Sequence, residues 1–214
     1  MSDALDINNP IISIFFFISF LSFLPAVLIM FTSFTRIVII LSFLRQAIGG
    51  QQTPPNPVII GLSFFITLFI MFPVIEKITQ DSITPYIDKE ITIGEALKRA
   101  EPPIKNFMLK QTRQKDLALF FHLSKEEIPS EPIDSPLKIV VLAFVISELK
   151  TAFEISFLLF LPFIIIDMVI SSILLSLGMM MLPPVLISLP FKLLLFVLID
   201  GWNIVVASIV RSFQ

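Results

Sequence analysis

Six charged residues lie within or beside apolar runs of the sequence: Glu148, Lys150, Glu154, Asp167, Lys192 and Asp200. An ionised group in such surroundings is destabilising by several kcal/mol unless it is paired, and charges at membrane depth are candidate functional residues. The chemistry that these residue types predict is therefore ion pairing. Lys150 and Glu154 can pair with each other, because residues four apart lie on one face of a helix.

Lys192 has the strongest need for a partner, because residues 168–191 before it carry no charge. We expect its partner to be Glu148, and Asp167 and Asp200 are the alternatives. If the Glu148–Lys192 pair joins different subunits, it would set their register, as buried polar groups do in some assemblies. The simpler alternative is that the Lys192 side chain extends its ammonium group to a membrane interface.

Three consecutive methionines, Met179, Met180 and Met181, follow Gly178 and precede a proline pair at 183–184. Two prolines remove two backbone donors and block a continued helix, so residues 178–184 are predicted to form a loop, the methionine loop. Irregular backbone at membrane depth persists only where it is buried in protein or lines a cavity. Methionine is apolar and flexible, which suits the wall of a cavity that is closed at rest and opens when another molecule enters. The alternative is that the three methionines fill a gap in a core.

Residues for catalysis are scarce. Cysteine is absent and the one histidine, His122, lies in an aromatic run where we expect it to be packed rather than to act as a base. No metal-binding spacing or phosphate-binding glycine loop occurs. We therefore predict that the protein is not an enzyme and needs no cofactor. A net charge of −2 gives no indication of a nucleic-acid surface.

The elements that position these residues are apolar helices. Of the sequence, 56% is hydrophobic and mean hydropathy is +0.94, and most of the charges lie between residues 76 and 138. We predict an all-α, membrane-associated fold with two apolar blocks, 1–75 and 137–214, around a small polar helical insert, 76–136. Four windows have the length of a membrane span, at residues 11–31, 58–75, 157–177 and 184–204.

A further apolar helix is predicted before the third window, at residues 137–156, with a polar stripe that includes Ser147 and has Glu148 at its margin. Such a stripe should pack against protein rather than lipid. In the insert, Thr92 and Glu95 have the spacing of a capping box, and the proline pair at 102–103 is expected to end that helix.

The connection after the first window carries Arg36 and Arg45, which favours the cytoplasmic side for it and the periplasmic side for the insert. Pro25 in the first window favours a bend. The first six residues are acidic and lack the basic start of a signal peptide, so we expect the first window to be retained.

Seven segments in this order resemble the FliP family of flagellar export-gate proteins and its injectisome counterpart SctR. They are residues 30–36 (MFTSFTR), 44–49 (LRQAIG), 54–56 (PPN), 106–113 (NFMLKQTR), 147–155 (SELKTAFEI), 178–184 (GMMMLPP) and 189–202 (LPFK through DGW). The short sequences SFTR, QTR and LKTAF are similar to those of flagellar rather than injectisome members of the family.

The resemblance implies a pentamer that assembles with FliQ and FliR, alongside other export-apparatus membrane proteins, into a gate in the inner membrane at the flagellar basal body. Unfolded flagellar proteins would pass through it, and Met179, Met180 and Met181 would form a gasket around the closed pore. The family fold implies bent helical hairpins that pack on neighbouring subunits, largely lifted out of the membrane plane. Two alternatives stay open: the equivalent injectisome subunit, and an independent small transporter or channel.

Overall fold

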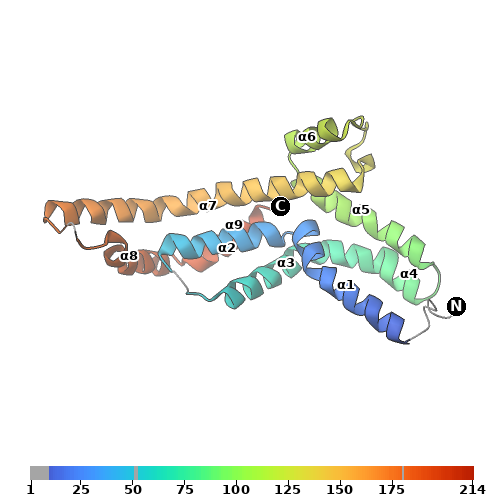
Figure 1. Ribbon diagram of the computed structural model, residues 1–214, viewed down its shortest axis with the longest axis horizontal. Helices are drawn as coiled ribbons and strands as arrows, with labels where there is room; N and C mark the ends of the chain where they lie inside the picture. Colours follow the sequence, from blue (N-terminus) through green and yellow to red (C-terminus); the bar gives the residue numbers. More distant parts are fainter. Residues whose placement is uncertain (1–9, 51–52, 180) are drawn as a thin grey trace.

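The computed structural model describes residues 10–50, 53–179 and 181–214, and within these ranges the chain is helical without any strand (Figure 1). The expected all-α class with long apolar helices is confirmed. The helices are α1 (Pro10–Phe31), α2 (Phe34–Ile48), α3 (Asn56–Ile78), α4 (Thr84–Ile87), α5 (Ile93–Gln111), α6 (Gln114–Ser124), α7 (Leu137–Ser176), α8 (Pro184–Leu198) and α9 (Gly201–Arg211). A π-helical turn, η2 (Thr79–Ile83), joins α3 to α4, and a 3-10 turn, η3 (Pro132–Asp134), precedes α7.

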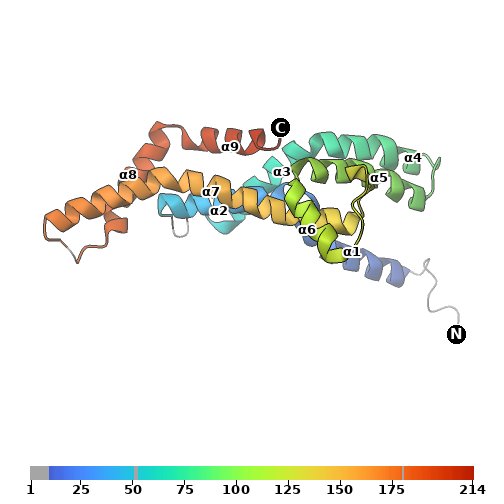
Figure 2. The same cartoon turned by 90° about the horizontal axis from the view of Figure 1, so that it is seen from above.

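The longest element is α7, which runs from the left end of the molecule to α6, with α1, α4 and part of α5 extending beyond it (Figures 1 and 2). Its 40 residues correspond to about 60 Å of helix. The prediction of separate helices at 137–156 and 157–177 is therefore wrong. No helix-ending signal lies between the two segments, and Pro162 is accommodated inside the helix.

The connection after the first window contains the helix α2, which packs along α7 and contributes more buried residues to the main core than any other helix. Its buried face is built from Ile37, Ile40, Leu41, Leu44, Ala47 and Ile48. These positions repeat every three or four residues, which is the period of one face of a helix. Gly49 ends α2 with a left-handed backbone, at φ 88°.

Two bends shape the apolar blocks. The axes of residues 25–31 and of α2 differ by 89°, with the break at Thr32–Ser33, whereas Pro25 lies inside α1. The fourth window is likewise broken, since α8 and α9 meet at 66° around Asp200, whose φ is 51°. Two described helices, Asn56–Ile87 and Leu137–Ser176, are long and apolar enough to cross a membrane, or up to four if each bent pair is one span.

The polar insert packs on α7 rather than forming a core of its own. Met108 of α5 is fully buried against Val140 and Phe144 of α7. The capping box is confirmed in part, since the Thr92 side chain accepts a hydrogen bond from the Glu95 backbone N–H. The proline pair at 102–103 does not end α5, because buried residues on both sides of it hold the helix against its neighbours.

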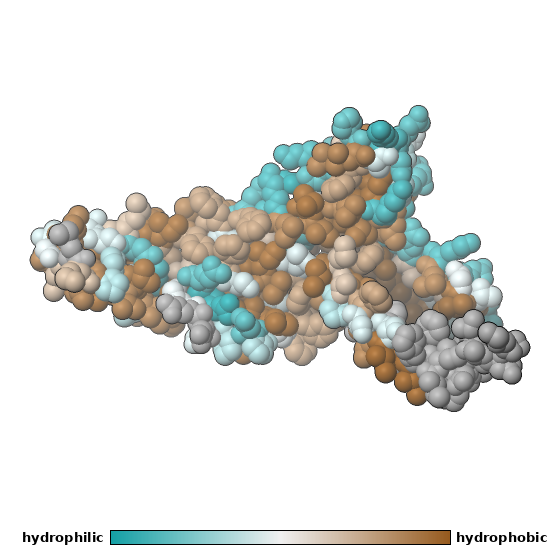
Figure 3. Space-filling model, viewed as in Figure 1, coloured by the Kyte–Doolittle hydropathy of each residue, from teal (hydrophilic) through white to brown (hydrophobic). Residues whose placement is uncertain are grey.

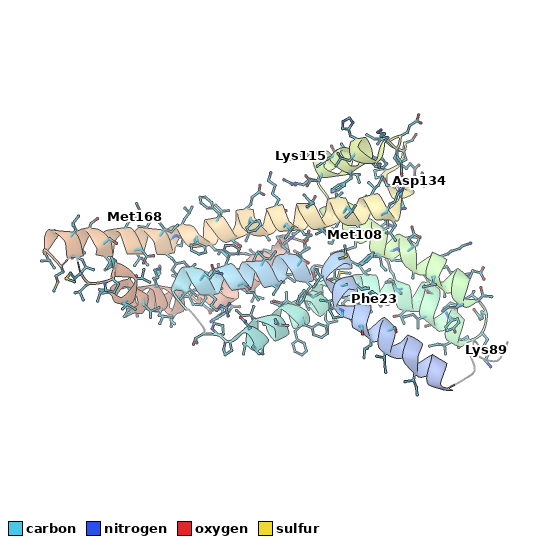
Figure 4. The ribbon with its side chains drawn as sticks, in the orientation of Figure 1. Phe23, Lys89, Met108, Lys115, Asp134 and Met168 are labelled. Carbon is cyan, nitrogen blue, oxygen red and sulfur yellow. The ribbon has the colours of Figure 1, made fainter. Side chains whose placement is uncertain are left out.

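Much of the surface is apolar. Figure 3 shows hydrophilic residues gathered over α6 and the segment after it, with hydrophobic residues along α7. Of the most apolar window of α7, only 6% is buried within the chain. The helix α1 projects from the body, and Phe23 on it and Met168 on α7 are both exposed (Figure 4). Exposed apolar area on this scale requires lipid or partner subunits to cover it.

Gly201 provides a test of the turn between α8 and α9. A Cβ there would lie 2.3 Å from ring atoms of Phe196, which is buried and packs edge-on against Trp202. We expect Gly201→Ala to displace this ring and lower the free energy of unfolding by about 1–3 kcal/mol, measured by thermal unfolding in detergent. Gly61→Ala, where the Cβ meets no atom within 4 Å, is the control and should be neutral or stabilising.

Candidate functional site

The most buried charged residues form a cluster at the centre of the molecule, where α2, α5, α7 and the C-terminal residues meet. Arg36 of α2 and Glu148 of α7 are 2% and 0% exposed. The Arg36 Nε donates to Glu148 Oε2 at 2.9 Å, and its Nη2 donates to the other carboxylate oxygen. This two-point contact is the geometry in which guanidinium and carboxylate groups bind most strongly.

The remaining donors of Arg36 hold the end of the chain. Its Nη1 donates to the backbone oxygen of Ser212 at 2.9 Å and to the Ser212 hydroxyl at 3.1 Å. Its Nη2 also donates to Gln111 Oε1 at 3.1 Å, and the Gln111 amide donates to the Phe213 carbonyl at 3.1 Å. The Phe213 ring lies 3.8 Å below the guanidinium carbon. We call Arg36, Glu148, Gln111, Ser212 and Phe213 the arginine node.

A second, partly buried pair joins α7 to α8. The Lys192 Nζ donates to Asp167 Oδ2 at 2.6 Å, and the Ser188 hydroxyl donates to Asp167 Oδ1 at 2.5 Å. Lys192 is 4% exposed, so its ammonium group does not extend to an interface. Because the methionine loop connects these same two helices, the pair fixes the hairpin that carries the loop.

The structure thus separates the two residues that were expected to pair. Glu148 binds Arg36, and Lys192 binds Asp167, which was one of the alternative partners. The physical reason is that Arg36 reaches Glu148 from the adjacent helix α2, an element that the sequence pattern did not reveal. Within the chain, the Glu148–Lys192 pairing is therefore replaced by two separate pairs.

The other predicted charges lie nearer the surface. Lys150 and Glu154 form the expected pair at 3.4 Å, with both side chains largely exposed. Asp200 is exposed and accepts a hydrogen bond from Asn203 at 2.8 Å. His122 is exposed rather than packed in an aromatic cluster.

A third polar contact fastens α6 to α7. Ser147 is fully buried and donates to Asp116 Oδ2 at 2.6 Å, while Arg113 pairs with the same carboxylate. Burial alone raises the pKa of Asp116, but the hydrogen bonds from Ser147 and Arg113, with the charges of Arg113 and Lys115, bring it below its usual value. The contribution of Asp116 to stability is therefore present near neutral pH and is lost as the pH falls through the lowered pKa.

The methionine loop lies at the far end of the α7–α8 hairpin (Figure 1). Leu177 to Pro183 separate the two helices, and Gly178 turns the chain with φ 72°. Met179 is 46% exposed and Met181 is 98% exposed, whereas Met180 lies outside the described residues. Met179 and Met181 therefore do not fill a gap in the core of this chain. They are free to meet another surface.

Sequence reasoning missed Arg36 as a structural residue, and it missed Gln111 and Ser212 entirely. Arg36 was interpreted as a signal for membrane orientation. It follows a charge-free stretch, residues 7–35, so the reasoning applied to Lys192 could have singled it out. No local pattern marks Gln111 or Ser212, because their role exists only where four distant segments meet.

Fold and site together define an all-helical membrane protein, built on a long helical hairpin with internal ion pairs and an exposed methionine loop at its end. The FliP family matches residues 17–209. The chain belongs to the FliP family.

Close relatives support this assignment. The chain is 57% identical to the flagellar biosynthetic protein FliP of Bacillus subtilis (strain 168), over 88% of this chain and 86% of that protein. It is 55% identical to the protein of the same name from Aquifex aeolicus (strain VF5), over 95% of this chain and 86% of that protein. Identity to the Caulobacter vibrioides protein is 54%, over 91% and 73%.

Removing one partner of the buried Arg36–Glu148 pair should be strongly destabilising, because it leaves an uncompensated charge in the interior. We expect Glu148→Ala and Arg36→Ala each to cost about 3–5 kcal/mol, measured by thermal unfolding or by protease resistance of the detergent-solubilised protein. Lys150→Ala, at the exposed pair with Glu154, is the matched control and should change stability by less than about 0.5 kcal/mol. Equal effects at both sites would contradict the importance of the arginine node.

Exchanging charges distinguishes Asp167, the observed partner of Lys192, from Glu148, the expected one. Asp167→Lys and Lys192→Asp should each destabilise the α7–α8 hairpin by about 1–3 kcal/mol, and the double exchange should restore part of the loss. Exchanging Glu148 and Lys192 should restore nothing within one chain. The measurement is the thermal stability of the purified monomer. If exchanging Glu148 and Lys192 restored stability and exchanging Asp167 and Lys192 did not, the Lys192–Asp167 pair would be wrong.

Proposed function

We propose that this chain is the core pore-forming subunit of the flagellar type III protein export gate, and that it passes unfolded flagellar subunits. Membership of the FliP family makes it a flagellar biosynthesis protein of the export apparatus. The observation that carries the finer proposal is the methionine loop, an exposed apolar segment held at the end of a long hairpin.

In the proposed gate, several copies of the chain surround one axis and present Met179, Met180 and Met181 to it. A ring of thioether side chains makes an apolar constriction that small ions cross poorly, because water leaves such a constriction. The same side chains have soft rotamers, so a polypeptide under a driving force can part them. The loop would then act as a gasket that seals the pore at rest and yields to an exported chain.

The surface of the chain supports assembly. Apolar side chains are exposed along α3, α7 and α8, and we propose that further copies of the chain, expected to be five in total, cover much of it together with FliQ and FliR. The complex would lie in the inner membrane at the basal body, alongside other export-apparatus membrane proteins, with the insert on the periplasmic side. The ion pairs at the arginine node and at Lys192 would keep each hairpin rigid while its outer faces bind neighbours.

The three relatives described above are named flagellar, which favours the flagellar apparatus over the injectisome alternative. An independent transporter would place Asp167 and Lys192 along a substrate path. Instead, the two charges pair with each other between α7 and α8. The export-gate proposal therefore accounts for more of the structure.

The gasket is tested by shortening its side chains. Replacing Met179, Met180 and Met181 together by alanine should make membranes that carry the assembled complex leak ions, because alanine leaves the constriction open to water. The measurement is the conductance of the complex, isolated with FliQ and FliR, in planar bilayers. Met168→Ala, at an exposed methionine on α7, is the control and should stay at background. If the triple variant also stayed at background, the gasket role would be wrong.

A further inference from the structure

A cavity of about 590 Å³ lies between the C-terminal part of α3, the turn η2 and α5, and Phe213 of the arginine node closes part of it. Its apolar lining includes Ile70, Val74, Pro102, Pro103, Phe107 and Phe213. Such a volume is typical of ligand sites and of grooves that take a short peptide segment. Nothing in the proposed pore role requires this cavity.

The charges of the cavity are arranged along its length. Arg99 and Lys110, both on α5, are eleven residues apart, which corresponds to about 16 Å along the helix. Pro102, Pro103 and Phe107 lie between them. Lys77 adds a third cation from α3, and Asp81 is the acidic residue of the lining. Along α5 the cavity thus has a cation on each side of an apolar middle, a pattern that fits a segment with two acids around an apolar residue.

The chain itself carries a segment of this pattern between α6 and α7. Residues 127–131, the acidic segment, read Glu-Ile-Pro-Ser-Glu and lie outside the helices. Glu127 and Glu131 are exposed, and Ile128 is 66% exposed. In an extended backbone the two glutamates are about 13 Å apart, close to the separation of the cations. Pro129 limits the backbone freedom that ordering would remove.

The acidic segment cannot fill the cavity of its own copy in the observed fold. In both Figures 1 and 2, α6 and the segment after it lie on the other side of α5 from α3 and α4. Asp134, just beyond the segment, is on the outer edge of the molecule (Figure 4). Glu126, just before it, is held to Lys138 of α7 at 2.6 Å, which anchors the segment on this outer face.

We propose that the acidic segment of one copy docks into this cavity of a second copy, with Ile128 in the apolar middle, Glu127 at one of its cationic ends and Glu131 at the other. The contact joins different surfaces of the two copies, and contacts of this type close into rings when the rotation between copies permits. The inference rests on the proposed self-assembly and specifies one interface within it. Electrostatic matching of this kind fixes register and excludes wrong partners.

The chain has no cysteine, so a pair of introduced cysteines reports on one contact. Ile128→Cys combined with Asn106→Cys, at the cavity, should give a dimer band with a short bismaleimide in membranes that contain the full export gate. Glu154→Cys with Asn106→Cys is the matched control, because Glu154 is equally exposed but lies away from the segment, and it should give no such band. Native gels of the same membranes, without cross-linker, report on assembly.

Charge exchange makes the test independent of cysteine placement. In the same cysteine background, Arg99→Glu with Lys110→Glu, or Glu127→Lys with Glu131→Lys, should each lower the dimer band about tenfold, and all four changes together should restore it. Intact assemblies on native gels without a dimer band would overturn the docking but leave the proposed function standing. Absence of any self-assembly would overturn both. Loss of binding to phosphatidylglycerol vesicles in the cavity variant, without rescue by the reversed segment, would identify a lipid site instead and overturn the docking.

Discussion

The arrangement of the whole chain depends on one buried ion pair. Arg36 and Glu148 are almost wholly excluded from solvent, and the guanidinium also holds Gln111, Ser212 and the Phe213 ring. Four segments that are far apart in the sequence therefore converge on one side chain. A buried charge is tolerated only when its hydrogen-bonding capacity is used. Displacing any one of these segments would leave a buried donor or acceptor of this cluster without a partner, which destabilises the packing of the other segments.

This constraint explains how a chain with so little internal core keeps a defined shape. The faces of α7 that point outward are apolar and mostly uncovered, so hydrophobic burial within the chain is modest compared with that of a globular domain. Polar contacts instead tie the helices together in two regions of α7: the arginine node and Ser147–Asp116 in one, and Lys192–Asp167 in the other. The apolar faces stay available for partners, which is what the proposed assembly requires.

Sequence reasoning worked where the signal was local. The helical character of the apolar windows and of the insert, the Thr92 cap and the break between α7 and α8 follow from composition, spacing and backbone chemistry at neighbouring residues. It failed where packing outweighed a local rule. The proline pair at 102–103 stays inside α5, because flanking buried residues hold the helix in place, and α7 continues through residues 156–157, where two separate helices were expected.

The sequence by itself determined that charges such as Glu148 and Lys192 needed partners, and that the methionines had to lie in a loop. These conclusions rest on properties of single residues: the cost of burying a charge, and the missing backbone donor of proline. Only the tertiary structure decided which partner each charge has. That choice depends on which helices lie side by side: α2 places Arg36 against Glu148, and α8 places Lys192 against Asp167. The packing of α2 on α7 is set by a core whose residues come from several distant helices, so no local pattern in the sequence reveals it.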